Sequence, residues 1–300
     1  MERRTLGRTG MEVSRIGLGL AQIGAFALEE ADRVRALVNR ALDCGITFLD
    51  TAASYRNSEA LVGPALASRR DECVLATKCG HWAAEVPWTA QTVRDHIEQS
   101  LRRLSTDRLD LVQLHSCDVD VLEQGDVIRA LMDARDAGKT RFVGYSGDNA
   151  AAEWAVESGL FDTLQTSFNL VDQRARTRLF PRARQAGMGV IVKRTIANAT
   201  WGGSRASAGT TVQFDTLHER SAAMGALGPV PGAPDDPVQT SLGFTLAHPE
   251  VDVALVGSTN PAHVEANVRL VETELPIRAE VVEICRRRFE QVGADWVQLT

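Results

Sequence analysis

Short apolar runs alternate with helical patterns along most of the chain. Apolar residues at 34, 37, 38, 41 and 42 have helical spacing, and Gly45 follows them as a stop signal. Eight runs have the length of buried strands, at 16–20, 46–50, 74–78, 110–114, 141–145, 163–167, 188–192 and 253–257. Alternating strands and helices predict a parallel sheet, and eight such units favour a closed (β/α)8 barrel, the TIM barrel, over an open sheet.

Three segments depart from this alternation. Residues 3–6 and 12–14 flank the glycine-rich turn 7–10 and predict an N-terminal β-hairpin. Residues 195–240 are rich in Gly, Ala, Ser and Pro and predict a long loop after the seventh strand, either functional or an insertion without a role. Residues 279–300 predict a C-terminal helix and tail. We expect one barrel domain over 1–300.

Composition narrows the class of protein. The 300 residues are 44% hydrophobic and 24% charged, which is typical of a globular chain and excludes wholesale disorder. A net charge of −6 disfavours nucleic-acid and anionic-membrane partners. The five scattered cysteines indicate free thiols, and neither a signal peptide nor a run of about 20 apolar residues is present. We therefore expect a cytoplasmic protein.

Polar side chains stand where the apolar runs end. Asp50 closes the second run, Lys78 closes the third, and His115 follows the fourth. Ser146 follows the fifth run, and Gln165 lies in the sixth. Barrel enzymes build their sites at the C-terminal ends of the strands. A single such Asp is more often a helix cap, but Asp, Lys and His on three consecutive strand ends favour an active site.

Tyr55 lies five residues after Asp50 and adds a group that can transfer a proton. A tyrosine ordinarily titrates near pH 10, and a neighbouring ammonium group stabilises its phenolate. A carboxylate would hold that ammonium in place. Asp50, Lys78 and Tyr55 therefore predict a proton-transfer relay, and His115 could position a carbonyl oxygen.

Motifs along nearly the whole chain resemble one family. FLDTAASY (48–55), TK (77–78) and QLH (113–115) carry Asp, Tyr, Lys and His in the order and spacing of the aldo-keto reductases. The stretches RTLGRTGMEVSRIGLG, SLRRLSTDRLDLVQLH, GKTRFVGYSG, QTSFNL and VGSTNPAHVEANV resemble further motifs of the family. The resemblance implies an NAD(P)H-dependent oxidoreductase that reduces an aldehyde or ketone, or oxidises the alcohol.

The resemblance also implies roles for single residues. Tyr55 would donate the proton, Lys78 tied to Asp50 would favour the phenolate, and His115 would orient the carbonyl, while the cofactor transfers the hydride. Ser146 and Gln165 would hold the nicotinamide carboxamide. The other implied cofactor contacts are Gly19, Leu20, Asp50, Gly257, Ser258, Thr259, His263 and Asn267.

Three positions depart from the family pattern. Many relatives place Asn after the serine that matches Ser146, but here Gly147 follows, so Asn149 is a candidate substitute. Relatives commonly offer an aromatic ring where Lys193 stands, and we expect Lys193 and Arg194 to contact the pyrophosphate or carboxamide instead. Residues 257–267 contain no Lys or Arg to bind a 2′-phosphate. We expect NADPH from the resemblance, with NADH or dual use as the alternative.

Other interpretations stay open. Lys78 could form a Schiff base as in an aldolase, although Asp50 would keep it charged, or the chain could be a cofactor-binding regulatory subunit with little turnover. Cys79, His81, His115 and Cys117 have a spacing that could suit zinc, but we expect no metal.

Trp82, Trp88 and Trp201 could line a substrate pocket or serve local packing. Neither the substrate nor the oligomeric state follows from the sequence.

Overall fold

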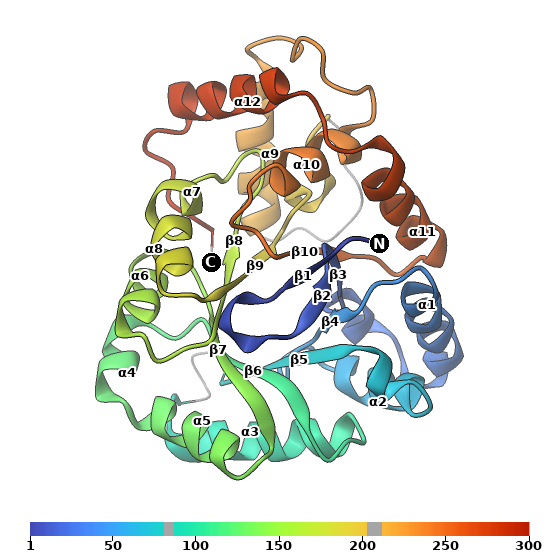
Figure 1. Cartoon of the computed structure of the whole chain (residues 1–300), viewed down its shortest axis with the longest axis vertical. Coiled ribbons are helices and arrows are strands. Elements are labelled where there is room, and N and C mark those ends of the chain that lie inside the picture. The colour runs from blue at the N-terminus through green and yellow to red at the C-terminus, as the bar shows by residue number, and fades with distance from the viewer. Residues whose placement is uncertain (81–86, 203–211, 300) are drawn as a thin grey trace.

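Eight parallel strands close into a barrel in the order β10-β3-β4-β5-β6-β7-β8-β9 (Figure 1). The computed structural model describes residues 1–80, 87–202 and 212–299. The strands are β3 (Ile16–Gly19), β4 (Phe48–Asp50), β5 (Val74–Cys79), β6 (Leu109–His115), β7 (Thr140–Ser146), β8 (Thr163–Ser167), β9 (Gly189–Lys193) and β10 (Val253–Gly257). Each predicted run contributes one strand, so the barrel prediction is confirmed.

Helices form the outer layer of the barrel (Figure 1). They are α1 (Ala31–Asp43), α2 (Ser58–Leu66), α3 (Ala90–Arg103), α4 (Val119–Gln124), α5 (Asp126–Asp136), α6 (Asn149–Ser158), α7 (Ala175–Arg178), α8 (Phe180–Gln185), α9 (Val212–Gly225), α10 (Pro237–Leu246), α11 (Pro261–Arg269) and α12 (Ala279–Val292). The apolar face predicted around Val34 and Leu37 is buried in α1, and Gly45 follows that helix with a φ of +83°. No described helix has the length and apolar character that a membrane span requires.

The predicted N-terminal hairpin is confirmed as β1 (Arg3–Thr5) paired antiparallel with β2 (Glu12–Ser14). It packs across one end of the barrel, in front of the strands in Figure 1. Leu6, Met11 and Val13 join the apolar cluster of the barrel interior. Gly7 has a φ of +47°, and a Cβ there would lie 2.1 Å from the Gly189 nitrogen, so only glycine fits this contact.

The alternation of side chains along each strand determines which residues point into the barrel interior. Phe48, Ala76 and Ile191 belong to the interior apolar cluster. Because side chains alternate between the two faces of a strand, the residue two positions later points inward as well. This places Asp50, Lys78 and Lys193 on the inner face, at the C-terminal rim.

The segment 195–240, expected to be a loop, contains α9 and the start of α10. A cavity of about 770 Å³ lies among α9, α10, α12 and the residues that connect α9 to α10. After α12, residues 293–299 return to the carboxyl ends of β7, β8 and β9, where Gln298 bonds to Ser167.

Candidate active site

Asp50 and Lys78 form a buried ion pair at the rim. Lys78 Nζ donates to Asp50 Oδ2 at 2.6 Å and to the Thr51 carbonyl at 2.8 Å. Burial alone would lower the pKa of Lys78, but the Asp50 carboxylate and the Tyr55 phenol together outweigh burial and raise it. The lysine is therefore held as an ammonium group, which disfavours the aldolase alternative because a Schiff base needs the neutral amine.

Tyr55 and His115 complete the predicted group of four. Lys78 Nζ lies 4.9 Å from the centroid of the half-buried Tyr55 ring. The His115 ring packs edge-on against Tyr55, with ring centroids 5.7 Å apart. His115 Nδ1 lies 3.2 Å from the hydroxyl of Ser54. The structure thus brings a phenol, an ammonium group and an imidazole to one place at the barrel mouth.

Arg103 on α3 and the buried Glu59 hold the loop that carries Tyr55. Arg103 on α3 donates to the Ala53 carbonyl at 3.3 Å and lies 3.7 Å from the Glu59 carboxylate. Glu59 is fully buried and accepts a hydrogen bond from the Thr77 hydroxyl at 2.7 Å, and burial raises the pKa of Glu59. Sequence reasoning missed Glu59 and Arg103, although Glu59 lies only four residues after Tyr55.

Ser146 and Gln165 connect to the same group. The Ser146 hydroxyl donates to Gln165 Oε1 at 2.7 Å, and Gln165 Nε2 donates to Asp50 Oδ1 at 3.1 Å. All three side chains are buried; Ser146 and Gln165 lie on the neighbouring strands β7 and β8, and Asp50 lies across the barrel mouth on β4. A hydroxyl, an amide and a carboxylate in one row offer both donors and acceptors, which suits recognition of a carboxamide.

Tyr145 explains why a glycine is needed at position 147, where the sequence departs from the family pattern. A Cβ at Gly147 would lie 2.5 Å from the hydroxyl oxygen of Tyr145. That hydroxyl is buried and donates to the Cys117 carbonyl at 2.7 Å. A side chain at position 147 would therefore displace Tyr145. The candidate substitute, Asn149, donates its side-chain amide to the Gln298 carbonyl at 3.1 Å.

Lys193 and Arg194 both meet Asp148. Lys193 Nζ lies 2.9 Å from Asp148 Oδ2, and Arg194 Nη1 lies 3.9 Å from the same oxygen. Arg194 also donates to the Ser167 hydroxyl at 2.5 Å and to the Leu299 carbonyl at 2.7 Å. Asp148 is fully buried, and no sequence argument had singled it out. Cofactor contacts by Lys193 and Arg194 remain a prediction.

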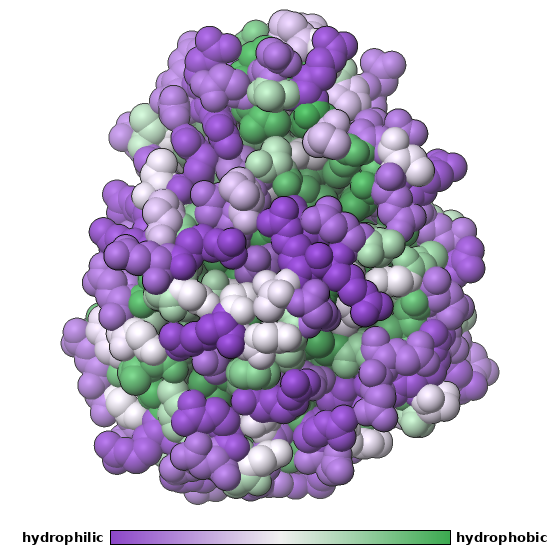
Figure 2. Space-filling model, viewed as in Figure 1, coloured by the Kyte–Doolittle hydropathy of each residue, from purple (hydrophilic) through white to green (hydrophobic). Residues whose placement is uncertain are grey.

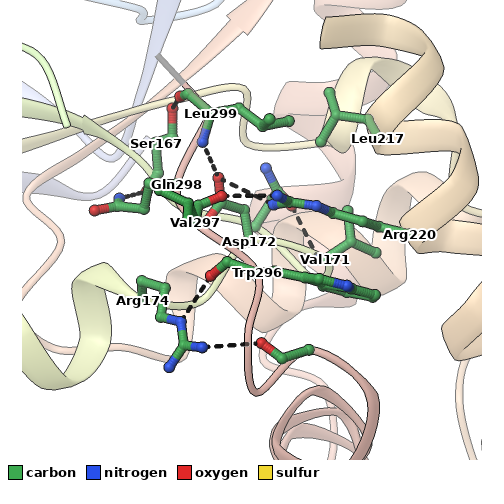
Figure 3. Close-up of polar contacts among 12 residues, drawn as sticks. Ser167, Val171, Asp172, Arg174, Leu217, Arg220, Trp296, Val297, Gln298 and Leu299 are labelled. Carbon is green, nitrogen blue, oxygen red and sulfur yellow. Dashed lines mark hydrogen bonds and ion pairs between the residues drawn. The ribbon is translucent and has the colours of Figure 1, made fainter. Parts of the chain in front are cut away.

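The returning segment 293–299 is bound by several side chains (Figure 3). Arg174 donates to the carbonyls of Trp296 and Gly293, and Arg220 donates to the carbonyl of Val297. Gln298 Nε2 donates to the Ser167 carbonyl at 2.8 Å. The Leu299 amide donates to Asp172 Oδ2 at 3.1 Å. These contacts hold the segment against the rim on the side of Asp148.

The predicted adenosine-binding segment follows β10. Gly257 pairs in register with Gly19, and a Cβ added at Gly19 would lie at an ordinary contact distance of 3.7 Å from Gly257. Ser258 accepts a hydrogen bond from the Asn260 amide at 3.0 Å. Within 257–267, His263 is exposed, while Thr259 and Asn267 are half-buried. The buried Leu20 donates its amide to the Asp50 carbonyl at 2.9 Å.

The three tryptophans proposed for the substrate pocket differ in position. Trp82 lies outside the described residues. Trp88 packs against Gly80, where an added Cβ would overlap its ring. Trp201 lines the cavity of about 770 Å³. Among the described residues no group of three His, Cys, Asp or Glu side chains is arranged to hold a metal ion. His81, one of the four residues considered for zinc, lies outside the described residues.

Comparison with known proteins identifies the family. The model of the Aldo/keto reductase family matches residues 15–287. An L-galactose dehydrogenase of Arabidopsis thaliana is 30% identical over 289 residues, which cover 92% of this chain and 89% of that protein. An NADH-specific methylglyoxal reductase of Escherichia coli is 28% identical over 222 residues, 64% of this chain and 66% of that protein.

A solved structure gives the same result for the fold. The holo form of an aldo-keto reductase from Bacillus halodurans superposes with a TM-score of 0.79 at 25% identity, covering 96% of each chain. The superposition spans the barrel and its surrounding helices. Because the family model spans most of its length, the chain belongs to the aldo-keto reductase family.

Proposed function

We propose that this oxidoreductase reduces an aldehyde or ketone with NADPH and that Tyr55 donates the proton to the carbonyl oxygen. The observation that carries the proposal is the contact of Tyr55 with both Lys78 and His115 at the barrel mouth. Family membership supports a carbonyl-reducing oxidoreductase in general. The roles of single residues are our inference from their geometry.

The residues at the rim fit a nicotinamide cofactor. The buried row of Ser146, Gln165 and Asp50 offers donors and acceptors to a carboxamide. Gly19 and Gly257, which pair in register at the rim, carry no side chain of their own there. When bound, the cofactor supplies the hydride that reduces the carbonyl carbon.

The protein's own groups then handle the proton. His115 positions the carbonyl oxygen near the Tyr55 hydroxyl, which gives up its proton as negative charge develops on that oxygen. The Lys78 ammonium stabilises the phenolate that remains, and Asp50 holds Lys78 in place. Electrostatic stabilisation of this kind is greatest in a site that excludes water.

Local chemistry gives NADH as the second candidate cofactor. Residues 257–267 contain no Lys or Arg, and Glu265 is paired with Arg40 at 2.5 Å. A dianionic 2′-phosphate is best held by Arg or Lys. NADPH remains our proposal because of the resemblance to the family.

The first experiment is a parallel fluorescence titration of the folded protein with NADPH and NADH. Binding of either supports the reductase, and the ratio of the two affinities identifies the cofactor. Turnover is then measured on a panel of aldehydes, ketones and sugar-derived carbonyls, because one relative is named for a sugar and another for methylglyoxal. Binding without turnover would favour a regulatory subunit, and failure to bind either would refute the proposal.

A further inference from the structure

Two of the three lysines in this chain occupy the same kind of position. The sequence has 33 basic residues, of which only Lys78, Lys139 and Lys193 are lysines. Lys78 and Lys193 lie on the inner face of the rim, and each is paired with a buried aspartate, at 2.6 Å and 2.9 Å. Lys139 instead lies half-exposed and pairs with Glu98 away from the rim.

Lys193 belongs to the part of the rim that we assign to the nicotinamide. It ends β9 in register with Ser167, which lies two residues after Gln165 on the same face of β8. Two residues are one full period of a strand, so Gln165, Ser167 and Lys193 share the inner face. The positive charge of Lys78 also contributes to lowering the pKa of Lys193.

Asp148 fixes the position of Lys193. Its Oδ1 accepts hydrogen bonds from the Ser167 amide at 2.7 Å and from the Thr166 hydroxyl at 2.8 Å. Its Oδ2 faces Lys193 at 2.9 Å and Arg194 at 3.9 Å. Two cations thus share one carboxylate, so Asp148 alone does not neutralise both of them. Burial lowers the pKa of Lys193, and the Asp148 carboxylate opposes that effect.

We propose that Lys193, positioned by Asp148, makes the site discriminate between the redox forms of the cofactor. The reduced nicotinamide ring is uncharged, whereas the oxidised ring carries a positive charge. A fixed ammonium group beside the ring disfavours the oxidised form by like-charge repulsion in a partly buried site. The site would then favour the reduced cofactor, which is the form that carbonyl reduction consumes. This inference rests on the proposed function.

The test compares dissociation constants for NADPH and NADP⁺, measured by calorimetry without substrate. The readout is the Kd of NADP⁺ divided by the Kd of NADPH. Lys193→Met removes the charge and should lower this ratio by about three- to tenfold. Asp148→Asn leaves the cations uncompensated and should raise it. Lys193→Arg keeps the charge and should preserve the wild-type ratio.

Lys139→Met is the matched control, because it removes a lysine remote from the rim, and it should leave the ratio unchanged. General damage to the site weakens binding of both cofactor forms together and leaves the ratio of the two Kd values unchanged. A change in the ratio therefore reports the effect of the charge rather than damage to the site. An unchanged ratio in Lys193→Met, with both cofactor forms still bound, would overturn this inference and leave the reductase proposal standing. Failure of the wild type to bind NADPH or NADP⁺ would overturn this inference and the proposed use of NADPH.

Discussion

Gln165 Nε2 lies 3.1 Å from Asp50 Oδ1, so the side of the rim that we assign to the carboxamide and the Lys78–Asp50 pair share one carboxylate. Lys78 occupies the other oxygen of Asp50, and Ser146 extends the row beyond Gln165. All these side chains are buried. A change at Gln165 should therefore affect both cofactor binding and the position of Lys78, the lysine in the proposed relay.

Gln165→Leu removes the side-chain amide at nearly constant volume. It leaves Asp50 Oδ1 and the Ser146 hydroxyl without their partner, and an unsatisfied buried polar group costs about 1–3 kcal/mol. We expect cofactor affinity to fall by about tenfold or more, measured by fluorescence titration. Gln91→Leu, on the exposed face of α3, serves as the control and should bind the cofactor normally.

Tyr55→Phe removes only the hydroxyl that we propose as the proton donor. The ring can keep its edge-on contact with His115, so the site should retain its shape. We expect turnover to fall by about 10³-fold or more, while cofactor affinity changes less than twofold. Steady-state kinetics and titration of the same preparation check both numbers. Equal losses of binding and turnover would contradict the assigned role.

Lys78→Met should remove activity and also destabilise the fold. It leaves the Asp50 carboxylate buried without its cation, and breaking such a pair costs about 3–5 kcal/mol. Adding Asp50→Asn removes the stranded charge, so the double variant should recover part of the stability but none of the activity. Urea unfolding and turnover assays separate the two effects. Activity retained in Lys78→Met would refute the relay.

Most of the barrel and the central site follow from local sequence patterns. Each apolar run marks a strand, and a strand end at the rim fixes where Asp50, Lys78 and His115 must lie. The helix α9 was hidden within a segment rich in small residues. Its buried residues Phe214, Leu217 and Met224 do have helical spacing, so a signal for it was present.

Other parts of the site depend on contacts between distant segments. Asp148 meets Lys193 from another strand end, and Gln298 reaches Ser167 across 131 positions of the chain. Gly147 accommodates the Tyr145 ring, whose hydroxyl bonds to the Cys117 carbonyl 28 positions away in the chain. No periodicity or local spacing encodes such pairings, because they arise only when the barrel closes.

Gly147→Ala tests the close approach of Tyr145. The added Cβ would lie 2.5 Å from the tyrosine hydroxyl oxygen and 2.6 Å from a ring carbon, so the buried ring must move. We expect a loss of about 1–3 kcal/mol in the free energy of unfolding, as for other overpacked sites. Gly225→Ala, at an exposed position of α9 with no atom within 4 Å of the new Cβ, should be neutral or slightly stabilising. Similar stabilities for the two variants, measured by urea unfolding, would refute the steric argument.

Asp172 should make the free energy of unfolding fall as the pH rises. An ordinary ion-paired carboxylate has the opposite effect, because its contribution is lost as the pH falls. Burial raises the pKa of Asp172 to about 7, and its Oδ1 has no hydrogen-bond partner among the described residues. The folded chain therefore binds this proton more tightly than the unfolded chain, whose Asp titrates near pH 4. The contribution is fully present below about pH 4 and is lost as the pH rises to about 7. Asp172→Asn lacks the charge, so its Tm relative to the wild type should rise between pH 5 and pH 8.5. The exposed control Asp107→Asn should show no such change. If the Tm difference between Asp172→Asn and the wild type were equal at both pH values, the folded chain would hold the Asp172 proton no more tightly than the unfolded chain.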